Sequence, residues 1–473
     1  MRPLEFTKLV CTIGPSCDDT AILKKMIEGG LNIARLNLSH GDHQYHSAVI
    51  KRIRKISHEI AVMLDTKGPE IRTDVLDRPL DLTKNEILTL TNKGTDPVKR
   101  MIHQSHQGLA KDIKVGDRVL ISDGAVQLKV VSISGDDVKC RVLSDCVLGS
   151  NKSVIIPGRD VSLPDLTGKD REDLAFGFEH DVDFIALSYV TEASTVKEVR
   201  DMMERIGKDI AIIPKIEHPT AVKNIDEIIE ASDGIMVARG DLGLNISVET
   251  VPMVQKMIVR KANEAGKPVV VATQMLESMT TNLSPTRAEA SDVANAILDG
   301  ADAVMLSGET AIGDHPLEAV ETMIRIIRDV DPKMPERELA LNTCTDIPEA
   351  IAMSVDRISR CLDIKAIITP TSSGFTPNLI AKHRPKVPIV ALSTHEKVSR
   401  RLEIVRGVFQ FRSTKKEKSK KLADAVKMAI QDGVLKKDDL VVITFNHKKT
   451  KHLKTTNCLE IMRVSELLTR HSY

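Results

Sequence analysis

Two short apolar runs in this chain end in charged residues that could hold a metal ion and move an anionic group. The run 211–217 ends in Lys215 and Glu217, and the run 234–241 ends in Arg239 and Asp241. Each run is too short for a helix and predicts a buried parallel strand. Side chains two apart on a strand share a face, so Lys215 and Glu217 should point the same way. Such charges are buried only where they pair or bind a metal, which indicates a structural ion pair or a metal-dependent active site.

The elements that must position these charges form a repeating pattern. Strand-like runs occur at 7–14, 32–39, 61–67, 182–188, 211–217, 234–241, 268–274 and 303–308. Most are separated by predicted helices, at 18–28, 45–57, 193–205, 220–230, 250–264 and 287–298. Eight strands alternating with helices favour a (β/α)8 TIM barrel, whose active site lies at the C-terminal strand ends. A doubly wound sheet is the alternative topology.

Polar groups able to bind ions stand at the ends of the second to eighth runs. In chain order they are Arg35, Asn37 and Ser39; Asp65, Thr66 and Lys67; Ser188; Lys215 and Glu217; Arg239 and Asp241; Thr273 and Gln274; Ser307 and Glu309. A structural network would not be expected to place charge at so many strand ends on one side. The pattern therefore favours an active site at a barrel mouth.

Two further domains are predicted from breaks in the β/α alternation. Residues 70–158 look all-β, and the run 116–131 predicts a hairpin with its turn at Asp123-Gly124. The insert leaves the C-terminal end of a strand, so we expect a small β-barrel lid over the barrel mouth. An α/β pattern restarts after Asp331. The predicted α/β chain has a catalytic barrel at 1–69 and 159–330, a lid at 70–158 and a C-terminal regulatory domain at 331–473.

The composition argues against several classes of partner. Lys and Arg number 67 and Asp and Glu 66, a net charge of +1 that leaves no basic excess for nucleic acid. No apolar run reaches the length of a membrane span, and the N-terminus lacks the apolar core of a signal peptide. The seven cysteines are scattered without a C-x-x-C pair, which is typical of reduced thiols. We expect a cytoplasmic protein with no nucleic-acid or membrane partner.

The motifs together resemble the pyruvate kinase family. They are T-K-L-V-C-T-I-G-P-S, A-R-L-N-L-S-H-G, D-T-K-G-P-E-I-R-T, K-I-E, M-V-A-R-G-D-L-G, V-A-T-Q-M-L-E-S-M, S-P-T-R-A-E-A-S-D-V-A-N-A and D-G-A-D-A-V-M-L-S-G-E-T-A. The match covers essentially the whole barrel and extends more weakly through the insert and the C-terminal domain. It implies phosphoryl transfer from phosphoenolpyruvate to ADP, giving pyruvate and ATP in glycolysis, and a homotetramer.

The resemblance also implies roles for individual residues. Lys215, Thr273 and Arg35 would be catalytic, and Glu217 and Asp241 would hold Mg2+ or Mn2+. The implied K+ ligands are Asn37, Ser39, Asp65 and Thr66. The implied substrate contacts are Arg35, Lys215, Gly240, Asp241, Thr273 and Ser188, and the implied nucleotide contacts are Arg72, Lys169, Asn37 and His40. Members with glutamate in the G-P-E-I-R stretch generally need a monovalent cation, and this chain has Glu70; a surface carboxylate is the alternative.

A loop in the C-terminal domain is a candidate effector site. It gathers hydroxyls and N–H groups before a predicted helix, which favours a phosphate; an ordinary helix cap at Thr376 before Pro377 is the alternative. In many family members the matching loop binds the phosphate of an allosteric activator. The candidate residues are Thr371, Ser372, Ser373, Gly374, Phe375 and Thr376, with basic residues at 415–421 or 448–454 to complete the site.

Two other functions remain open. A phosphoenolpyruvate/pyruvate-type lyase or aldolase would also place Glu and Asp on Mg2+, but it needs neither the K+ ligands nor a long lid. An inactive sensor of phosphorylated metabolites would be favoured by loss of Lys215, Glu217 or Asp241, and all three are present.

Overall fold

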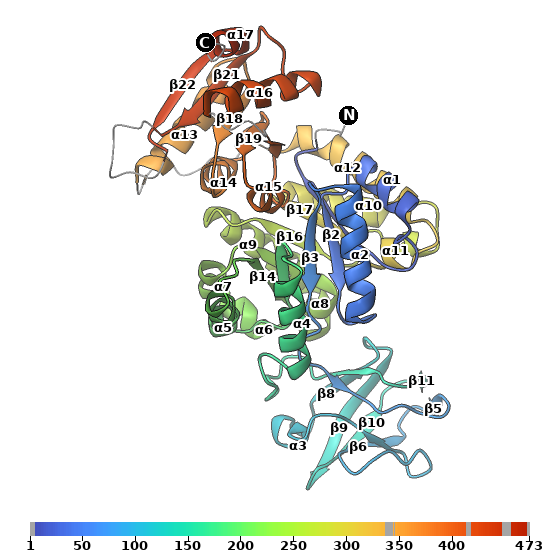
Figure 1. Ribbon diagram of the computed structural model, residues 1–473. Helices are drawn as coiled ribbons and strands as arrows, with labels where there is room; N and C mark the ends of the chain where they lie inside the picture. The colour runs from blue at the N-terminus through green and yellow to red at the C-terminus, as the bar shows by residue number, and fades with distance from the viewer. Residues whose placement is uncertain (1–4, 336–343, 345, 413–417, 447–455, 471–473) are drawn as a thin grey trace.

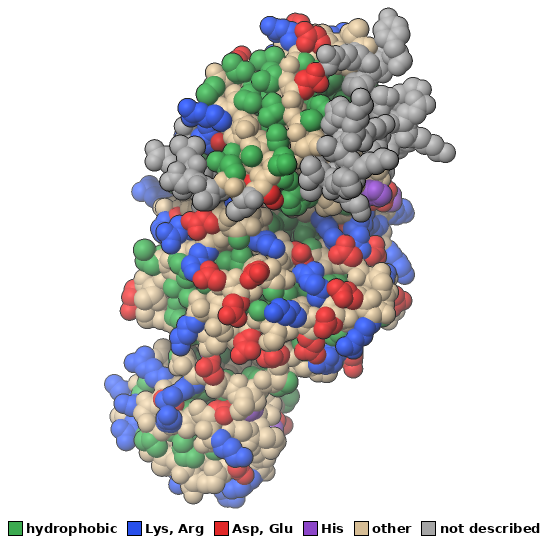
Figure 2. All heavy atoms as spheres, turned by 90° about the vertical axis from the view of Figure 1, so that its left-hand side faces the viewer, with side chains coloured by type: hydrophobic (Ala, Val, Ile, Leu, Met, Phe, Trp, Pro, Cys, Tyr) green, Lys and Arg blue, Asp and Glu red, His purple; other side chains and the backbone are tan. Residues whose placement is uncertain are grey.

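The computed structural model describes residues 5–335, 344, 346–412, 418–446 and 456–470. Figure 1 shows three parts stacked along one axis, with the barrel in the middle, the β insert at one end and the C-terminal domain at the other. Figure 2 shows acidic and basic side chains interspersed over one face of the barrel. Within the described residues, no helix is both long enough and apolar enough to cross a membrane.

The central part is a closed barrel of parallel strands, in the order β1-β17-β16-β15-β14-β13-β3-β2. The strands are β1 (Lys8–Thr12), β2 (Ile33–Asn37), β3 (Ala61–Asp65), β13 (Phe184–Leu187), β14 (Ala211–Ile216), β15 (Ile235–Ala238), β16 (Val269–Ala272) and β17 (Ala303–Leu306). All eight predicted strands are present, and the closure of the barrel shows that the doubly wound alternative is wrong. Buried side chains such as Val10, Met63 and Phe184 pack together inside the barrel.

The helices around the barrel mostly follow the predicted ranges. The matching helices are α1 (Thr20–Gly29), α2 (His43–Ile56), α5 (Ala193–Arg205), α9 (Val251–Glu264) and α10 (Arg287–Asp299). The prediction of one helix at 220–230 is wrong. The segment forms α6 (Pro219–Lys223) and α7 (Ile225–Ala231), which meet at Asn224, whose side-chain amide donates to the Thr191 carbonyl. Two helices were not predicted, α4 (Gly168–Glu179) and α12 (Pro316–Val330). The short helices α8 (Arg239–Asn245) and α11 (Gly308–Ala311) follow strands β15 and β17.

The insert is a strongly curled sheet in the order β4-β12-β8-β9-β10-β6-β7, accompanied by a two-stranded ribbon, β11-β5. Its elements are β4 (Ile71–Arg72), β5 (Leu80–Leu82), β6 (Ile87–Thr91), β7 (Met101–His103), α3 (Leu109–Asp112), β8 (Arg118–Ile121), β9 (Val126–Ser134), β10 (Asp137–Val142), β11 (Cys146–Leu148) and β12 (Ser153–Ile155). An isolated bridge between Thr73 and Gln104 joins the two edges of the sheet. The predicted hairpin is β8-β9, and Asp123 and Gly124 have φ of 52° and 88° at its turn.

The C-terminal domain is a five-stranded sheet in the order β20-β19-β18-β21-β22. Its elements are α13 (Ile347–Cys361), β18 (Ile364–Pro370), α14 (Phe375–Lys382), β19 (Ile389–Ser393), α15 (Glu396–Leu402), β20 (Val408–Arg412), α16 (Lys418–Gln431), β21 (Leu440–Phe445), β22 (Cys458–Arg463) and α17 (Val464–Arg470). Arg384 contacts Asp302 at 2.7 Å and Arg400 contacts Asp183 at 2.6 Å. Both aspartates stand just before barrel strands, so this domain docks on the N-terminal face of the barrel, opposite the insert (Figure 1).

Candidate active site

A cavity of about 750 Å³ lies at the C-terminal ends of the barrel strands, under the insert. The barrel contributes Lys215, Glu217 and Asp241, and the insert contributes Asp123 and Asn151 from its own loops. The insert therefore covers the barrel mouth in the manner of a lid. Because both parts line one cavity, motion of the lid would change access to the charged residues beneath it.

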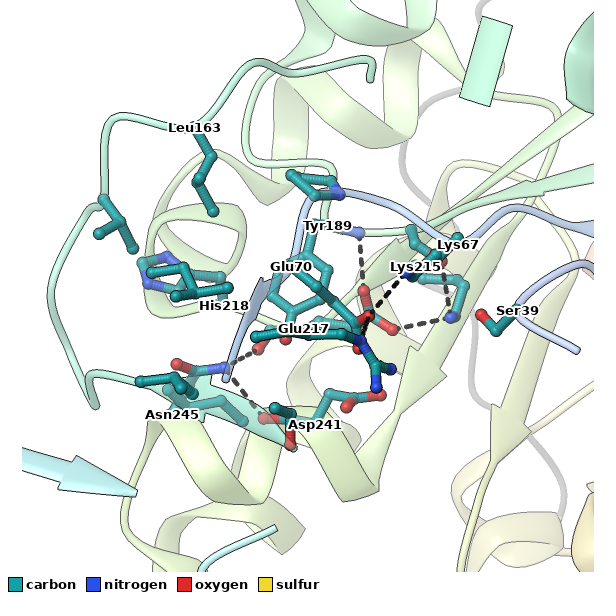
Figure 3. A pocket seen from close by; sticks show the side chains of 18 of the residues that line it. Ser39, Lys67, Glu70, Leu163, Tyr189, Lys215, Glu217, His218, Asp241 and Asn245 are labelled. Carbon is teal, nitrogen blue, oxygen red and sulfur yellow. Dashed lines mark hydrogen bonds and ion pairs between the residues drawn. The ribbon is translucent and has the colours of Figure 1, made fainter. Parts of the chain in front are cut away.

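Lys215 is the centre of the site (Figure 3). Its Nζ lies 2.9 Å from Glu217 Oε1 and 3.2 Å from Asp65 Oδ1. The same nitrogen donates to Ser188 Oγ at 2.9 Å. Only 11% of the Lys215 side chain is exposed, and Glu217 and Asp65 are 1% exposed each. The alternation of β14 thus brings Lys215 and Glu217 to one face, as predicted, and neighbouring strands supply the other partners.

The charges around Lys215 do not cancel. Arg35 Nε pairs with Asp65 Oδ2 at 2.6 Å, and Arg35 Nη1 donates to Thr12 Oγ1 at 2.8 Å. Arg35 and Lys215 therefore face three carboxyl groups, those of Asp65, Glu217 and Asp241, so ionising all three would leave an excess of negative charge.

The pKa values reflect this imbalance. Burial alone would lower the pKa of Lys215, but the carboxylates of Asp65, Glu217 and Asp241 outweigh it and raise that pKa above its usual range. Burial opposes ionisation of Asp65, yet Arg35 and Lys215 hold its pKa below normal. Burial, with Asp241 nearby, raises the pKa of Glu217 to about 8 despite the pairing with Lys215. A further cation beside Glu217 and Asp241 would relieve this unfavourable charge.

Hydrogen bonds hold the carboxylate of Glu217 and tie its strand end to the backbone of Asp241, the second residue that could hold a divalent ion. Tyr189 N donates to Glu217 Oε2 at 2.6 Å. Asn245 Nδ2 donates to the carbonyls of Glu217 and Asp241 at 3.0 and 3.1 Å, so it ties the end of β14 to α8. Among the described residues, no group of three or more His, Cys, Asp or Glu is placed to hold a metal. Two carboxylates alone suit Mg2+, which keeps several waters and binds substrate oxygens.

Thr273 lies in a strained turn beside Asp241. Thr273 and Gln274 have φ of 66° and 54°, values that non-glycine residues rarely adopt outside constrained sites. Arg239 Nη2 donates to both of their carbonyls, at 2.8 and 3.1 Å, and Arg239 Nη1 pairs with Asp292 at 2.6 Å. Thr273 Oγ1 accepts from Gly240 N at 2.7 Å, so its hydroxyl faces the start of α8.

The predicted K+ and nucleotide residues are only partly gathered at the cavity. Asn37, Ser39, His40 and Arg72 line it together with Arg35. Both oxygens of Thr66 are engaged in the barrel wall, since its carbonyl accepts from Ser188 Oγ at 2.6 Å and its Oγ1 donates to Ala186 O at 3.4 Å. Lys169 stands on α4 and pairs with Asp173 at 2.8 Å, away from the cavity lining.

The sequence reasoning missed several lining residues, among them Tyr189, His218 and Asn245. Tyr189 and His218 directly follow the predicted residues Ser188 and Glu217, and adjacency alone could have suggested them. Asn245 lies four residues after Asp241 and so on the same face of α8, which is a usable signal.

The candidate effector loop of the C-terminal domain differs from the prediction in the position of the helix cap. Helix α14 begins at Phe375, and Gly374, with φ of 85°, stands at its N-cap position. Thr376 lies inside the first turn and contacts Thr456 Oγ1 at 2.6 Å, so the alternative of a cap at Thr376 is wrong. Thr371 Oγ1 instead accepts from Gly374 N at 2.8 Å. Residues 415–417 and 448–454, and the side chains of 418–421, lie outside the described part of the chain.

A lidded TIM barrel with lysine, arginine and carboxylates buried at its mouth defines a class of enzyme that stabilises charge on anionic substrates with metal assistance. Comparison with models of protein families identifies the family within this class. The model of the pyruvate kinase barrel domain matches residues 4–320, and that of the pyruvate kinase alpha/beta domain matches residues 349–462. The chain belongs to the pyruvate kinase family.

Curated relatives match nearly the whole chain. The pyruvate kinase of Geobacillus stearothermophilus is 43% identical over 477 residues, which cover 98% of this chain and 81% of the relative. That of Dictyostelium discoideum is 44% identical over 480 residues, covering 97% of this chain and 94% of the relative. The pyruvate kinase of Staphylococcus aureus strain MRSA252 is 42% identical over 473 residues, which cover 97% of this chain and 80% of the relative.

Proposed function

We propose that the cluster centred on Lys215 carries out the pyruvate kinase reaction, the transfer of a phosphoryl group from phosphoenolpyruvate to ADP in glycolysis. The activity is that of the family to which the chain belongs. The observation that supports the residue assignment is the burial of Lys215 between Asp65 and Glu217 beneath the lid. A fixed cation in a water-poor cavity is what a transferring phosphoryl group requires.

Each residue of the cluster has a distinct proposed role. Lys215, kept protonated by its carboxylate neighbours, stabilises charge on the transferring group and does not act as a base. Arg35 binds phosphate oxygens while Asp65 orients its guanidinium. Thr273 lies beside the substrate, and Ser188 orients Lys215 through its hydroxyl. Glu217 and Asp241 would hold Mg2+ or Mn2+, which when bound neutralises charge on substrate oxygens. The lid excludes water, so that ADP is the acceptor.

The assignment is tested by measuring pyruvate release from phosphoenolpyruvate with and without ADP. Release should require ADP and a divalent cation. Release without ADP would favour the lyase or aldolase, and no release under any condition would favour the sensor.

We also propose that K+ binds near Asn37, Ser39, Asp65 and Thr66, and that Glu70 sets the requirement for it. Glu70 is not a free surface carboxylate, because it lies 2.8 Å from Arg72 Nε and 3.5 Å from Lys67 Nζ at the cavity edge. Glu70→Lys would put a third cation there in place of the carboxylate. We expect strong activation of the wild type by K+ and a weakened K+ requirement in Glu70→Lys. Full wild-type activity in rigorously K+-free buffer would contradict this.

A phosphorylated effector is proposed to bind at the loop of Thr371, Ser372, Ser373, Gly374, Phe375 and Thr376. In addition to the loop hydroxyls, Thr369 Oγ1 and Thr444 Oγ1 are buried on adjacent strands without a hydrogen-bond partner in the described chain. These strands meet at the point where the sheet order reverses, a usual place for ligands.

We expect a sugar phosphate or AMP to lower the half-saturating phosphoenolpyruvate concentration, with a coupling of about 1–3 kcal/mol. The measurement is a titration of candidate effectors against the wild type and a Thr371→Ala/Ser372→Ala/Ser373→Ala variant. Equal activation of both proteins would place the phosphate elsewhere.

The remaining proposals rest on the family. They are a homotetramer in the cytoplasm, with domain boundaries at 69/70, 158/159 and 330/331. Light scattering of the purified protein tests the tetramer, and a monomeric mass at assay concentration would refute it.

A further inference from the structure

Residues 159–162, here named the return strap, carry the chain back from β12 of the lid to α4 of the barrel. Two of its side chains are bound to the lid. Arg159 forms a bidentate pair with Asp117, through Nε to Oδ2 at 2.9 Å and Nη2 to Oδ1 at 2.8 Å. Ser162 donates to Asp112 from Oγ at 2.7 Å and from its backbone N at 2.9 Å. At these two positions the strap moves with the lid.

Asp160, between those two positions, is bound to the barrel. Thr220 Oγ1 donates to Asp160 Oδ1 at 2.5 Å. His218 Nε2 donates to the Arg159 carbonyl at 3.2 Å, and His218 Nδ1 accepts from Thr220 N at 3.3 Å, so Nδ1 makes no hydrogen bond to Asp160. His218 directly follows Glu217 at the end of β14. The barrel anchor of the strap is therefore built next to a carboxylate of the active site.

The lid makes a second approach to the barrel at its hairpin tip. A Cβ added at Gly124 would lie 3.7 Å from Leu244 Cδ2, so the tip is within van der Waals reach of α8. Gly158, with φ of 72°, stands at the start of the strap, where a glycine allows the backbone to turn. The lid thus approaches the barrel both at the strap and at its hairpin tip.

We propose that Asp160 is a positioning residue, which fixes the lid over the active cavity by anchoring the return strap to Thr220, beside the bond from His218 to the Arg159 carbonyl. The effect on catalysis rests on the proposed function of the cavity; the anchoring itself does not. An anchored lid holds the cavity near its substrate-bound shape, so less binding energy is spent on closing it. Losing the anchor should raise KM for both substrates and leave kcat nearly unchanged, because the groups around Lys215 are not touched.

The experiment compares Thr220→Val, which removes the donated hydrogen bond, with Thr220→Ser, which keeps it. Neither substitution changes the sequence around the Arg159–Asp160 peptide, so trypsin cleavage there reports the freedom of the strap without any activity assay. Thr220→Val should be cleaved about five-fold faster than the wild type and show about five-fold higher KM, the effect of one lost hydrogen bond. Thr220→Ser should match the wild type in both measurements.

A second pair of variants tests the other partner. Asp160→Ala should raise KM to the same extent, whereas Asp160→Asn keeps the acceptor oxygen and should stay near the wild type. The double variant Asp160→Ala/Thr220→Val should be no worse than either single variant. Asp136→Ala, an exposed lid carboxylate, is the matched control and should leave KM unchanged. Unchanged cleavage in Thr220→Val, or the same increase in Thr220→Ser, would overturn the anchoring even if the enzyme proved inactive.

Discussion

Lys215→Met should abolish phosphoryl transfer from phosphoenolpyruvate to ADP, with kcat lowered about 1000-fold or more. Methionine keeps most of the length of the side chain, being one atom shorter, and removes its charge. Arg35, the other cation of the cluster, is held in place by Asp65 and Thr12 and cannot move into the position of Lys215 Nζ. The site would then hold three carboxyl groups and one cation, so it would repel an anionic substrate and leave charge in the transition state without stabilisation.

The measurement pairs the kinase assay with proton exchange at C3 of pyruvate, which depends less on the phosphoryl group and should partly survive. Thermal unfolding must accompany it, since removing one partner of a buried charge cluster can destabilise the fold. Lys197→Met, on the exposed face of α5, controls for the substitution itself. Transfer at the wild-type rate in Lys215→Met would show that the lysine is structural.

Much of this site could be predicted because strand alternation and strand ends are local properties. The pairing of Lys215 with Glu217 follows from their spacing on one strand. The pairing of Lys215 with Asp65 does not, because it depends on how β14, β13 and β3 are packed around a closed barrel. The strained backbone of Thr273 is held by Arg239, whose guanidinium donates to the Thr273 carbonyl at the end of the next strand. No local sequence pattern predicts a contact between residues so far apart in the chain.

The missed helices have equally specific causes. Helix α4 begins with a capping box in which Thr167 and Asp170 bond to each other's backbone N–H. That signal was available in the sequence, but it stood in the segment between the lid and the next predicted strand, to which no helix was assigned. The division of 220–230 falls at Asn224, whose φ of −92° and ψ of 15° depart from helical values and whose side chain donates to the Thr191 carbonyl, a tertiary contact that no local pattern predicts.

Glu217→Gln should remove divalent-metal dependence together with nearly all turnover. Loss of one carboxylate from a two-carboxylate site should cost several kcal/mol of charge stabilisation, or at least about 100-fold in metal affinity. The side-chain amide in this variant would retain an oxygen for the Tyr189 N–H, so the local backbone should persist. Asp241→Asn should weaken metal binding similarly. Near-normal activity of either variant at ordinary Mg2+ would contradict the assignment.

Direct Mn2+ binding as a function of pH separates the two carboxylates. Burial raises the pKa of Glu217 to about 8, so below that pH a cation must displace a proton to bind. Wild-type affinity for Mn2+ should therefore rise about tenfold per unit as pH increases from roughly 6 to 8, and then level off. Glu217→Gln should lose this dependence on pH.

Asp241→Asn should shift the same dependence to lower pH. The negative charge of Asp241 contributes to the raised pKa of Glu217, and its removal lets Glu217 ionise more readily. The variant should thus bind Mn2+ more weakly at pH 8 but lose less affinity on acidification than the wild type does. If Glu217→Gln and Asp241→Asn weakened Mn2+ binding equally and to the same extent at every pH, Glu217 would not be the group that carries the proton.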